Sequence, residues 1–122
     1  MSYKDIKFAL TTDGSGDVTS TSTTAVNGEV VWIDVTDIDF AATADITISN
    51  VTRPGGTDFT ILTLTDQTTD IHVPVLIQAV GTTGSGLAAS NYVRPFVSGY
   101  LKVVVAQGGA AKTGTVVVHV KE

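Results

Sequence analysis

The sequence predicts an all-β protein, and three observations support this fold class. The chain has 122 residues, of which 20 are threonine and 18 are valine, and these β-branched residues favour strands over helices. No window of about a dozen residues has the apolar periodicity of an amphipathic helix. Short alternating runs are separated by Gly, Asp and Asn. We therefore expect one domain over residues 1–122, a two-sheet antiparallel sandwich of about eight strands that is jelly-roll-like, with an immunoglobulin-like sandwich as the alternative.

The first expected strand covers residues 4–12. Its apolar residues Ile6, Phe8 and Leu10 alternate with polar or small residues and therefore share one face. The segment 13–17, with the sequence DGSGD, has the residues that a tight turn requires. A strand that ends in a turn at this point is the simplest reading of the N-terminal region.

The next expected strands are 18–26 and 29–35, joined by a hairpin turn. Segment 18–26 is rich in hydroxyl side chains, which is typical of an edge strand. Asn27 and Gly28 are the residues that a type I′ turn prefers, because both of its central positions need positive φ.

The middle of the chain contains three further strands. Segment 44–51 alternates cleanly, whereas 59–66 has apolar residues on both faces and is expected at a central position. The intervening segment 53–56 contains Pro and two Gly and cannot continue a strand. Segment 71–80 is the third strand, and Pro74 within it favours an edge or a bulge.

The C-terminal region is expected to form a long loop and a hairpin. Residues 81–91 are rich in Gly, Ser and Thr and have no strand character. Segments 100–106 and 113–120 are two valine-rich strands, and the Gly-containing connection 107–112 suggests that they pair with each other.

The net charge of −5 argues against two classes of partner. No basic run is present, so neither nucleic acid nor an anionic membrane surface is an expected partner, and no apolar run approaches the ~20 residues of a membrane span. The chain has no cysteine, which excludes a disulfide framework and a thiol nucleophile.

The acidic residues do not form a recognisable catalytic or metal site. Segment 13–17 resembles the start of a calcium loop but lacks the later carboxylate, so a turn is the preferred interpretation. Asp34, Asp37 and Asp39 are close in sequence, but Asp34 and Asp37 have opposite strand parity. An acidic, solvated loop is therefore expected, with no metal and no cofactor.

The histidines, serines and tryptophan also lack a catalytic pattern. His72 and His119 have no third ligand near them in sequence, and neither Ser85 nor Ser98 lies in a Gly-x-Ser-x-Gly turn. Trp32 is expected to fill the core. We therefore expect a protein that is not an enzyme.

The candidate contact residues lie near the N-terminus and after the long loop. Tyr92, Arg94 and Phe96 combine residue types that are enriched in protein interfaces. Residues 1–5, including Tyr3 and Lys4, are a candidate N-terminal arm that could pair with a neighbouring chain by strand addition. The predicted protein-binding site consists of Tyr3, Lys4, Tyr92, Arg94 and Phe96.

Both ends of the chain resemble a known class of proteins. The N-terminal phrases are YKDIKF (3–8) and TDGSGDVT (12–19), and the C-terminal phrases are VSGYLKVVVA (97–106) and GGAAKTGTVVV (108–118). Together they resemble small virion proteins of tailed bacteriophages, of the capsid decoration or cement type.

This resemblance implies a compact β-sandwich or jelly roll that acts without catalysis. It implies a homo-oligomer, dimer or trimer, made in the host cytoplasm and bound outside the shell of major capsid protein, where it stabilises the head. The alternative function is a carbohydrate-binding or adhesin-like recognition module of a virion tail or cell surface.

Overall fold

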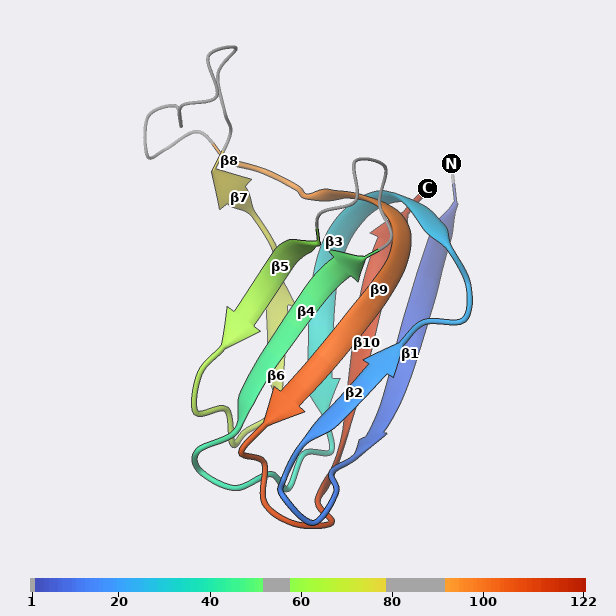
Figure 1. Ribbon diagram of the computed structural model, residues 1–122. Helices are drawn as coiled ribbons and strands as arrows, with labels where there is room; N and C mark the ends of the chain where they lie inside the picture. Colours follow the sequence, from blue (N-terminus) through green and yellow to red (C-terminus); the bar gives the residue numbers. More distant parts are fainter. Residues whose placement is uncertain (1, 52–57, 79–91) are drawn as a thin grey trace.

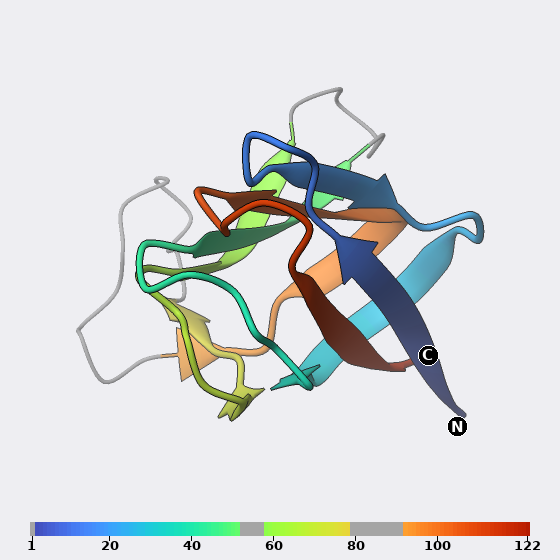
Figure 2. The same cartoon turned by 90° about the horizontal axis from the view of Figure 1, so that it is seen from below.

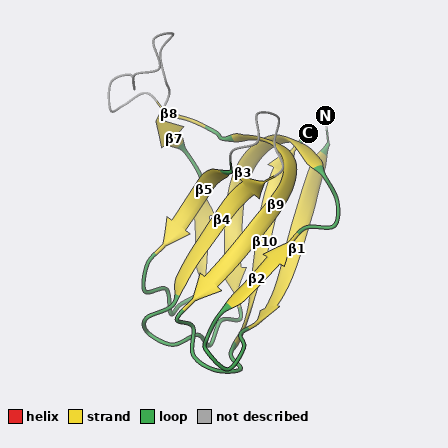
Figure 3. Ribbon diagram, in the orientation of Figure 1, coloured by secondary structure: helices red, strands yellow, loops and turns green. Residues whose placement is uncertain are grey.

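The computed structural model describes residues 2–51, 58–78 and 92–122, and this part of the chain is all-β (Figures 1 and 3). The described strands are β1 (Tyr3–Thr11), β2 (Val18–Thr21), β3 (Val26–Thr36), β4 (Asp45–Val51), β5 (Phe59–Leu64), β6 (Ile71–Pro74), β7 (Ile77–Gln78), β8 (Tyr92–Val93), β9 (Phe96–Ala106) and β10 (Thr113–Lys121). The expected segments 53–56 and 81–91 lie outside the described residues. Within the described ranges no helix occurs, and so none that could cross a membrane.

Eight of these strands form one antiparallel sheet. Its order is β1-β10-β3-β9-β4-β5, with β2 paired to β9 and β6 paired to β3, while β7 and β8 form a separate two-stranded ribbon. In Figures 1 and 2 the strands β2, β9, β4 and β5 lie in one layer, and β1, β10, β3 and β6 lie in another. The prediction of an all-β antiparallel fold with about eight strands is confirmed.

The alternation read from the sequence places the core between these layers. Ile6, Phe8 and Leu10 of β1 are buried, as are Ile46 and Ile48 of β4. Many other fully buried side chains follow the same alternation along their strands: Ile33 and Val35 of β3, Leu101, Val103 and Val105 of β9, and Val116 and Val118 of β10. In β3 the parity changes at a bulge, so that Val26 and Val30 are also fully buried. Each buried aliphatic side chain of this size contributes about 1.5–3 kcal/mol of burial free energy.

The predicted hairpin at Asn27 and Gly28 is wrong, because both residues lie inside β3. Gly28 pairs with Val97 of β9, and its neighbour Glu29 pairs with both β9 and β10. A Cβ at position 28 would lie 2.4 Å from the carbonyl oxygen of Lys121. Glycine is therefore required here for the close approach of β10, and a type I′ turn is not formed.

The expected strand 18–26 is shorter than predicted. Pairing of β2 with β9 ends at Thr21, and Ser22 is bound to β9 through both its backbone and its side chain. The Ser22 amide donates to the carbonyl of Leu101 at 2.8 Å, and the Leu101 amide donates to Ser22 Oγ at 3.1 Å. This exchange ends the ladder and lets the chain leave β9 before β3 begins.

The expected C-terminal hairpin is also wrong, because β9 and β10 do not pair. β9 pairs with β2, β3 and β4, whereas β10 pairs with β1 and β3. The connection 107–112 therefore carries the chain from one layer to the other (Figure 1). Gln107 and Gly109 have φ of 58° and 83°, and the Gly108 amide donates to the Gly16 carbonyl at 2.7 Å, which fixes this crossing against the 13–17 turn.

The places of β5, β6 and residues 3–5 in the sheet can also be compared with the predictions. β5 was expected to be central, yet it lies at the end of the sheet, where β4 is its one partner among the described strands. Within the described residues β6 is an edge strand that pairs with β3 alone, as Pro74 indicated, since proline lacks the donor that a second neighbour would need. Residues 3–5 of the candidate arm belong to β1 and pair with β10.

Replacing Gly28 with alanine tests the close approach of β3 and β10. Because backbone atoms surround the added methyl group, we expect Gly28→Ala to lower the free energy of unfolding by about 2–4 kcal/mol. Urea denaturation measures this change. Gly14→Ala is the control, since nothing lies within 4 Å of a Cβ at position 14, and equal midpoints for the two variants would contradict the argument.

Candidate functional site

Exposed apolar side chains gather at one end of the molecule. Leu76, Tyr92, Val93 and Phe96 are 58%, 51%, 48% and 64% exposed, respectively. They lie beside or within the β7–β8 ribbon and at the start of β9 (Figure 1). We call these four residues the apolar end. Arg94 lies between them and is also exposed.

The backbone around Pro95 supports the apolar end. Val93 pairs with Ile77 across the ribbon, and the chain then passes through Pro95, which is buried. The carbonyl of Pro95 accepts a hydrogen bond from the Val30 amide at 2.9 Å, so the exit from the ribbon is attached to β3. Phe96 then pairs with Glu29 and projects from the sheet.

The structure brings together three of the five predicted contact residues. Tyr92, Arg94 and Phe96 are exposed at the same end. Tyr3 is 62% exposed and lies on the same face as Phe96, but three strand spacings away, or about 14 Å. Lys4 has the opposite parity, is half-buried and borders a groove beside Ser22.

A second constellation lies on the outer face of β1, β10, β3 and β6. Asp5 pairs across the ladder with His119, and Asp34 pairs with His72. His119 Nδ1 contacts Asp5 Oδ1 at 2.7 Å, and its Nε2 contacts Asp34 Oδ2 at 2.9 Å. Asp34 Oδ1 accepts from His72 Nδ1. We call Asp5, His119, Asp34 and His72 the His–Asp chain.

Trp32 covers the His–Asp chain and is not in the core. Its ring lies 4.9 Å from that of His119 and 5.6 Å from that of His72, centroid to centroid and tilted in both cases. The prediction that Trp32 fills the core is wrong, because the inward positions of β3 belong to residues of the other parity, such as Ile33.

The histidines affect the ionisation of Asp34. Partial burial raises the pKa of Asp34, but hydrogen bonds from His72 and His119 and their positive charges lower it by more, so the pKa lies below its ordinary value of 3.8. The ionised form of Asp34 is therefore favoured by folding.

The groups of the His–Asp chain are paired with one another. In the described part of the chain, the side-chain hydrogen-bond partners of both imidazoles are carboxylates. Among the same residues, no group of three or more His, Asp or Glu side chains is arranged to hold a metal ion. The His–Asp chain therefore links side chains of four neighbouring strands, β1, β10, β3 and β6.

Several other acidic residues, among them Asp39 and Asp13, bind backbone amides. Asp39 accepts from the Thr113 amide at 2.7 Å, and Asp37 lies in a turn with φ of 53°. Asp13 accepts from the amides of Ser15 and Asp17 at 2.8 and 3.0 Å, and the bonds from Asp17 and then Ser15 lower the pKa of Asp13. This is the turn chemistry that the sequence predicted for 13–17.

Sequence reasoning missed the His–Asp chain because its members are far apart in the sequence. Asp5 and His119 are 114 positions apart, and Asp34 and His72 are 38 positions apart. The strand pattern favours solvent-side or half-buried positions for His72 and His119, whereas Trp32, which shares the parity of Asp34, is expected in the core. The pattern could not show that β10 and β6 flank β3, and this arrangement brings the two histidines to Asp34.

Comparison with protein-family profiles, with curated proteins and with solved structures finds no significant match. The function is therefore argued from the chain itself.

Replacing Asp34 with asparagine tests the His–Asp chain. We expect Asp34→Asn to lower the free energy of unfolding by about 1 kcal/mol at neutral pH, since the site is partly exposed. Because folding lowers the pKa of Asp34, its contribution is present above the unfolded value of 3.8 and is lost as the pH falls through the folded value.

Thermal unfolding of both proteins between neutral and acidic pH measures this effect. The difference in stability should shrink on acidification. Asp37→Asn is the control, because asparagine tolerates the positive φ at that exposed turn. A constant difference down to the lowest pH would show that the charge of Asp34 is not involved.

Proposed function

We propose that this protein is a non-enzymatic capsid decoration, or cement, protein of a tailed bacteriophage. In this proposal it binds the outer surface of the major capsid protein shell and stabilises the head. The observation that carries the proposal is the apolar end, where Leu76, Tyr92, Val93 and Phe96 are all about half exposed or more. Contiguous exposed apolar side chains are typical of protein contacts.

The composition of the apolar end supports binding to a protein. Tyr92, Phe96 and the adjacent Arg94 are of types enriched at interfaces, where a few aromatic and arginine residues provide most of the binding energy. The buried Pro95 and its bond to Val30 hold the backbone next to Phe96 in place, so little backbone entropy is lost when this segment binds.

The remaining properties suit a component on the outside of a virion. The net charge of −5 does not favour binding to the packaged genome. The resemblance at both ends of the chain supports the same location, with synthesis in the host cytoplasm and assembly as a homo-oligomer. We also propose that the two layers are a jelly-roll-like sandwich, the architecture which that resemblance implies.

A carbohydrate-binding or adhesin-like module is the second candidate. The observation that favours it is Trp32, a partly exposed aromatic ring beside the polar groups of Asp34 and His72. An aromatic face with adjacent hydrogen-bonding groups is suited to stacking on a sugar ring.

Co-sedimentation with purified capsids of the phage that encodes the chain tests the leading proposal. We expect binding to the capsid exterior, and we expect Tyr92→Ala with Phe96→Ala to weaken it at least tenfold. Tyr100→Ala is the matched control, because Tyr100 is a partly exposed aromatic residue of β9 outside the apolar end.

Two results would overturn the leading proposal. One is the absence of co-sedimentation at any concentration, and the other is binding that the double variant leaves unchanged. A glycan array run with the unmodified protein and with Trp32→Ala distinguishes the second candidate, since only that candidate predicts a signal that Trp32→Ala removes.

A further inference from the structure

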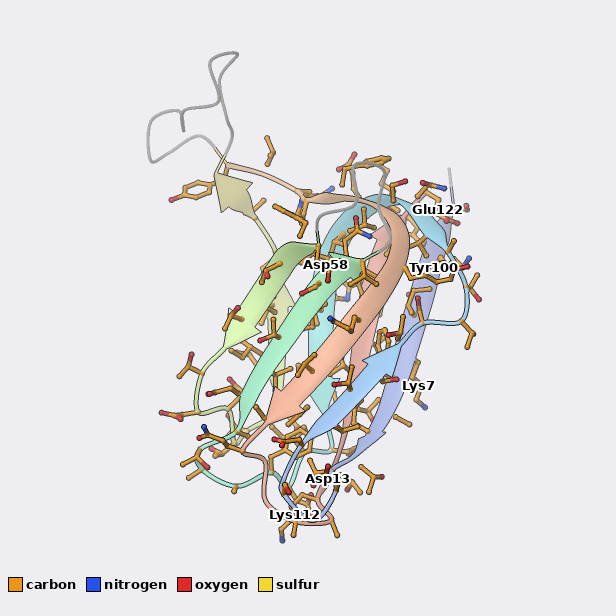
Figure 4. The ribbon with its side chains drawn as sticks, viewed as in Figure 1. Lys7, Asp13, Asp58, Tyr100, Lys112 and Glu122 are labelled. Carbon is orange, nitrogen blue, oxygen red and sulfur yellow. The ribbon has the colours of Figure 1, made fainter. Side chains whose placement is uncertain are left out.

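The outer edge of β1 is available for pairing. β1 is nine residues long and lies at the end of the sheet, where β10 is its paired neighbour among the described strands. A groove of about 200 Å³ lies beside residues 4–7, with Ser22, Thr23 and Thr24 of the β2–β3 connection on its other side. Figure 4 shows Lys7 projecting from β1 at this side of the molecule.

The hydrogen bonds at the two ends of β1 show which backbone groups face the free edge. Ser2 and Glu122 exchange backbone bonds of 3.5 and 2.9 Å, and the Thr12 amide donates to the Lys112 carbonyl at 2.8 Å. Bonded and non-bonded pairs alternate in an antiparallel ladder, so the even-numbered residues of β1 bond to β10. The amides and carbonyls of the odd-numbered residues therefore point away from the sheet.

Charge then distinguishes between the possible ways of pairing two such edges. Two copies related by a two-fold axis at Ile6 would place Asp5 of each copy opposite Lys7 of the other. An axis at Lys7 would instead place the two Lys7 side chains opposite each other. Opposite charges on directly paired residues stabilise a ladder, and like charges destabilise it.

We propose that this protein forms a two-fold homodimer in which β1 strands pair antiparallel about Ile6. The occupant of the edge is a second copy of the chain. Each Asp5 pairs with the second copy's Lys7, and each Tyr3 lies opposite the second copy's Ala9. The backbone groups of Tyr3, Asp5, Lys7 and Ala9 all point away from β10 toward the free edge, which gives about eight intermolecular backbone hydrogen bonds.

The same residues explain why this edge selects its own copy. A lysine on an exposed edge usually discourages pairing, because burial or a like charge opposes it. Here Asp5 is 63% exposed at its side chain, Lys7 is exposed, and their spacing of two residues makes the edge self-complementary. An edge contact of this length is small, so we expect a dimer in concentration-dependent equilibrium with the monomer.

Sedimentation of the purified protein from about 10 μM to 1 mM tests the dimer without any capsid, so its result is separate from that of the proposed function. We expect Lys7→Glu to weaken the dimer at least tenfold, and Asp5→Lys combined with Lys7→Glu to restore it. Ala9→Pro should also weaken it, because the Ala9 amide faces the free edge and is not needed by β10. Ala9→Ser is the matched control and should dimerise normally.

Hydrogen exchange provides a readout that a general loss of stability would not reproduce. As the concentration rises, the amides of Tyr3, Asp5, Lys7 and Ala9 should become protected. The even-numbered amides of β1 should be protected throughout, because they bond to β10. Protection that follows this parity supports the proposal.

Three results would overturn the dimer. The first is a monomer at all concentrations, and the second is a dimer that Lys7→Glu and Ala9→Pro leave unchanged. The third is a dimer that Lys7→Glu weakens and that the double charge exchange fails to restore, although thermal unfolding shows that all variants are folded.

Discussion

The fold depends on the way in which β3 serves two sets of neighbours. Its first residues pair with β9, and from Glu29 onward it pairs with β10, with β6 on its other side from Trp32. A single continuous strand thus joins both layers into one hydrogen-bonded sheet. The close approach of the Lys121 carbonyl at Gly28 is the geometric condition for this change of neighbours, because a side chain there would separate β3 from β10.

The two ends and faces of the molecule have different chemistry. The outer face of β1, β10, β3 and β6 has a hydrogen-bonded set of carboxylates and imidazoles under Trp32, whose groups are paired with one another. The apolar end has large side chains that are about half exposed or more among the described residues. We propose partner binding at the apolar end, whereas the His–Asp chain links side chains of neighbouring strands.

Local pattern predicted the strands but not their neighbours. Alternation correctly identified the inward residues of β1 and β4, since parity is a property of one strand alone. It assigned a turn to Asn27 and Gly28, whose preference for positive φ was outweighed by the tight contact with β10. It also paired 100–106 with 113–120, because short connections usually join neighbours. Closeness in sequence allowed Tyr92, Arg94 and Phe96 to be grouped in advance. It did not do so for Asp34, His72 and His119, which belong to three different strands.

The position of β10 has a consequence for synthesis in the cell. β10 is synthesised after the other described strands, yet it lies between β1 and β3, which are among the first. Until residues 113–121 have emerged from the exit tunnel, the inner edges of β1 and β3 lack their shared partner. We therefore expect the fold to be completed only after residues 113–121 have emerged, with exposed strand edges that chaperones would shield until then.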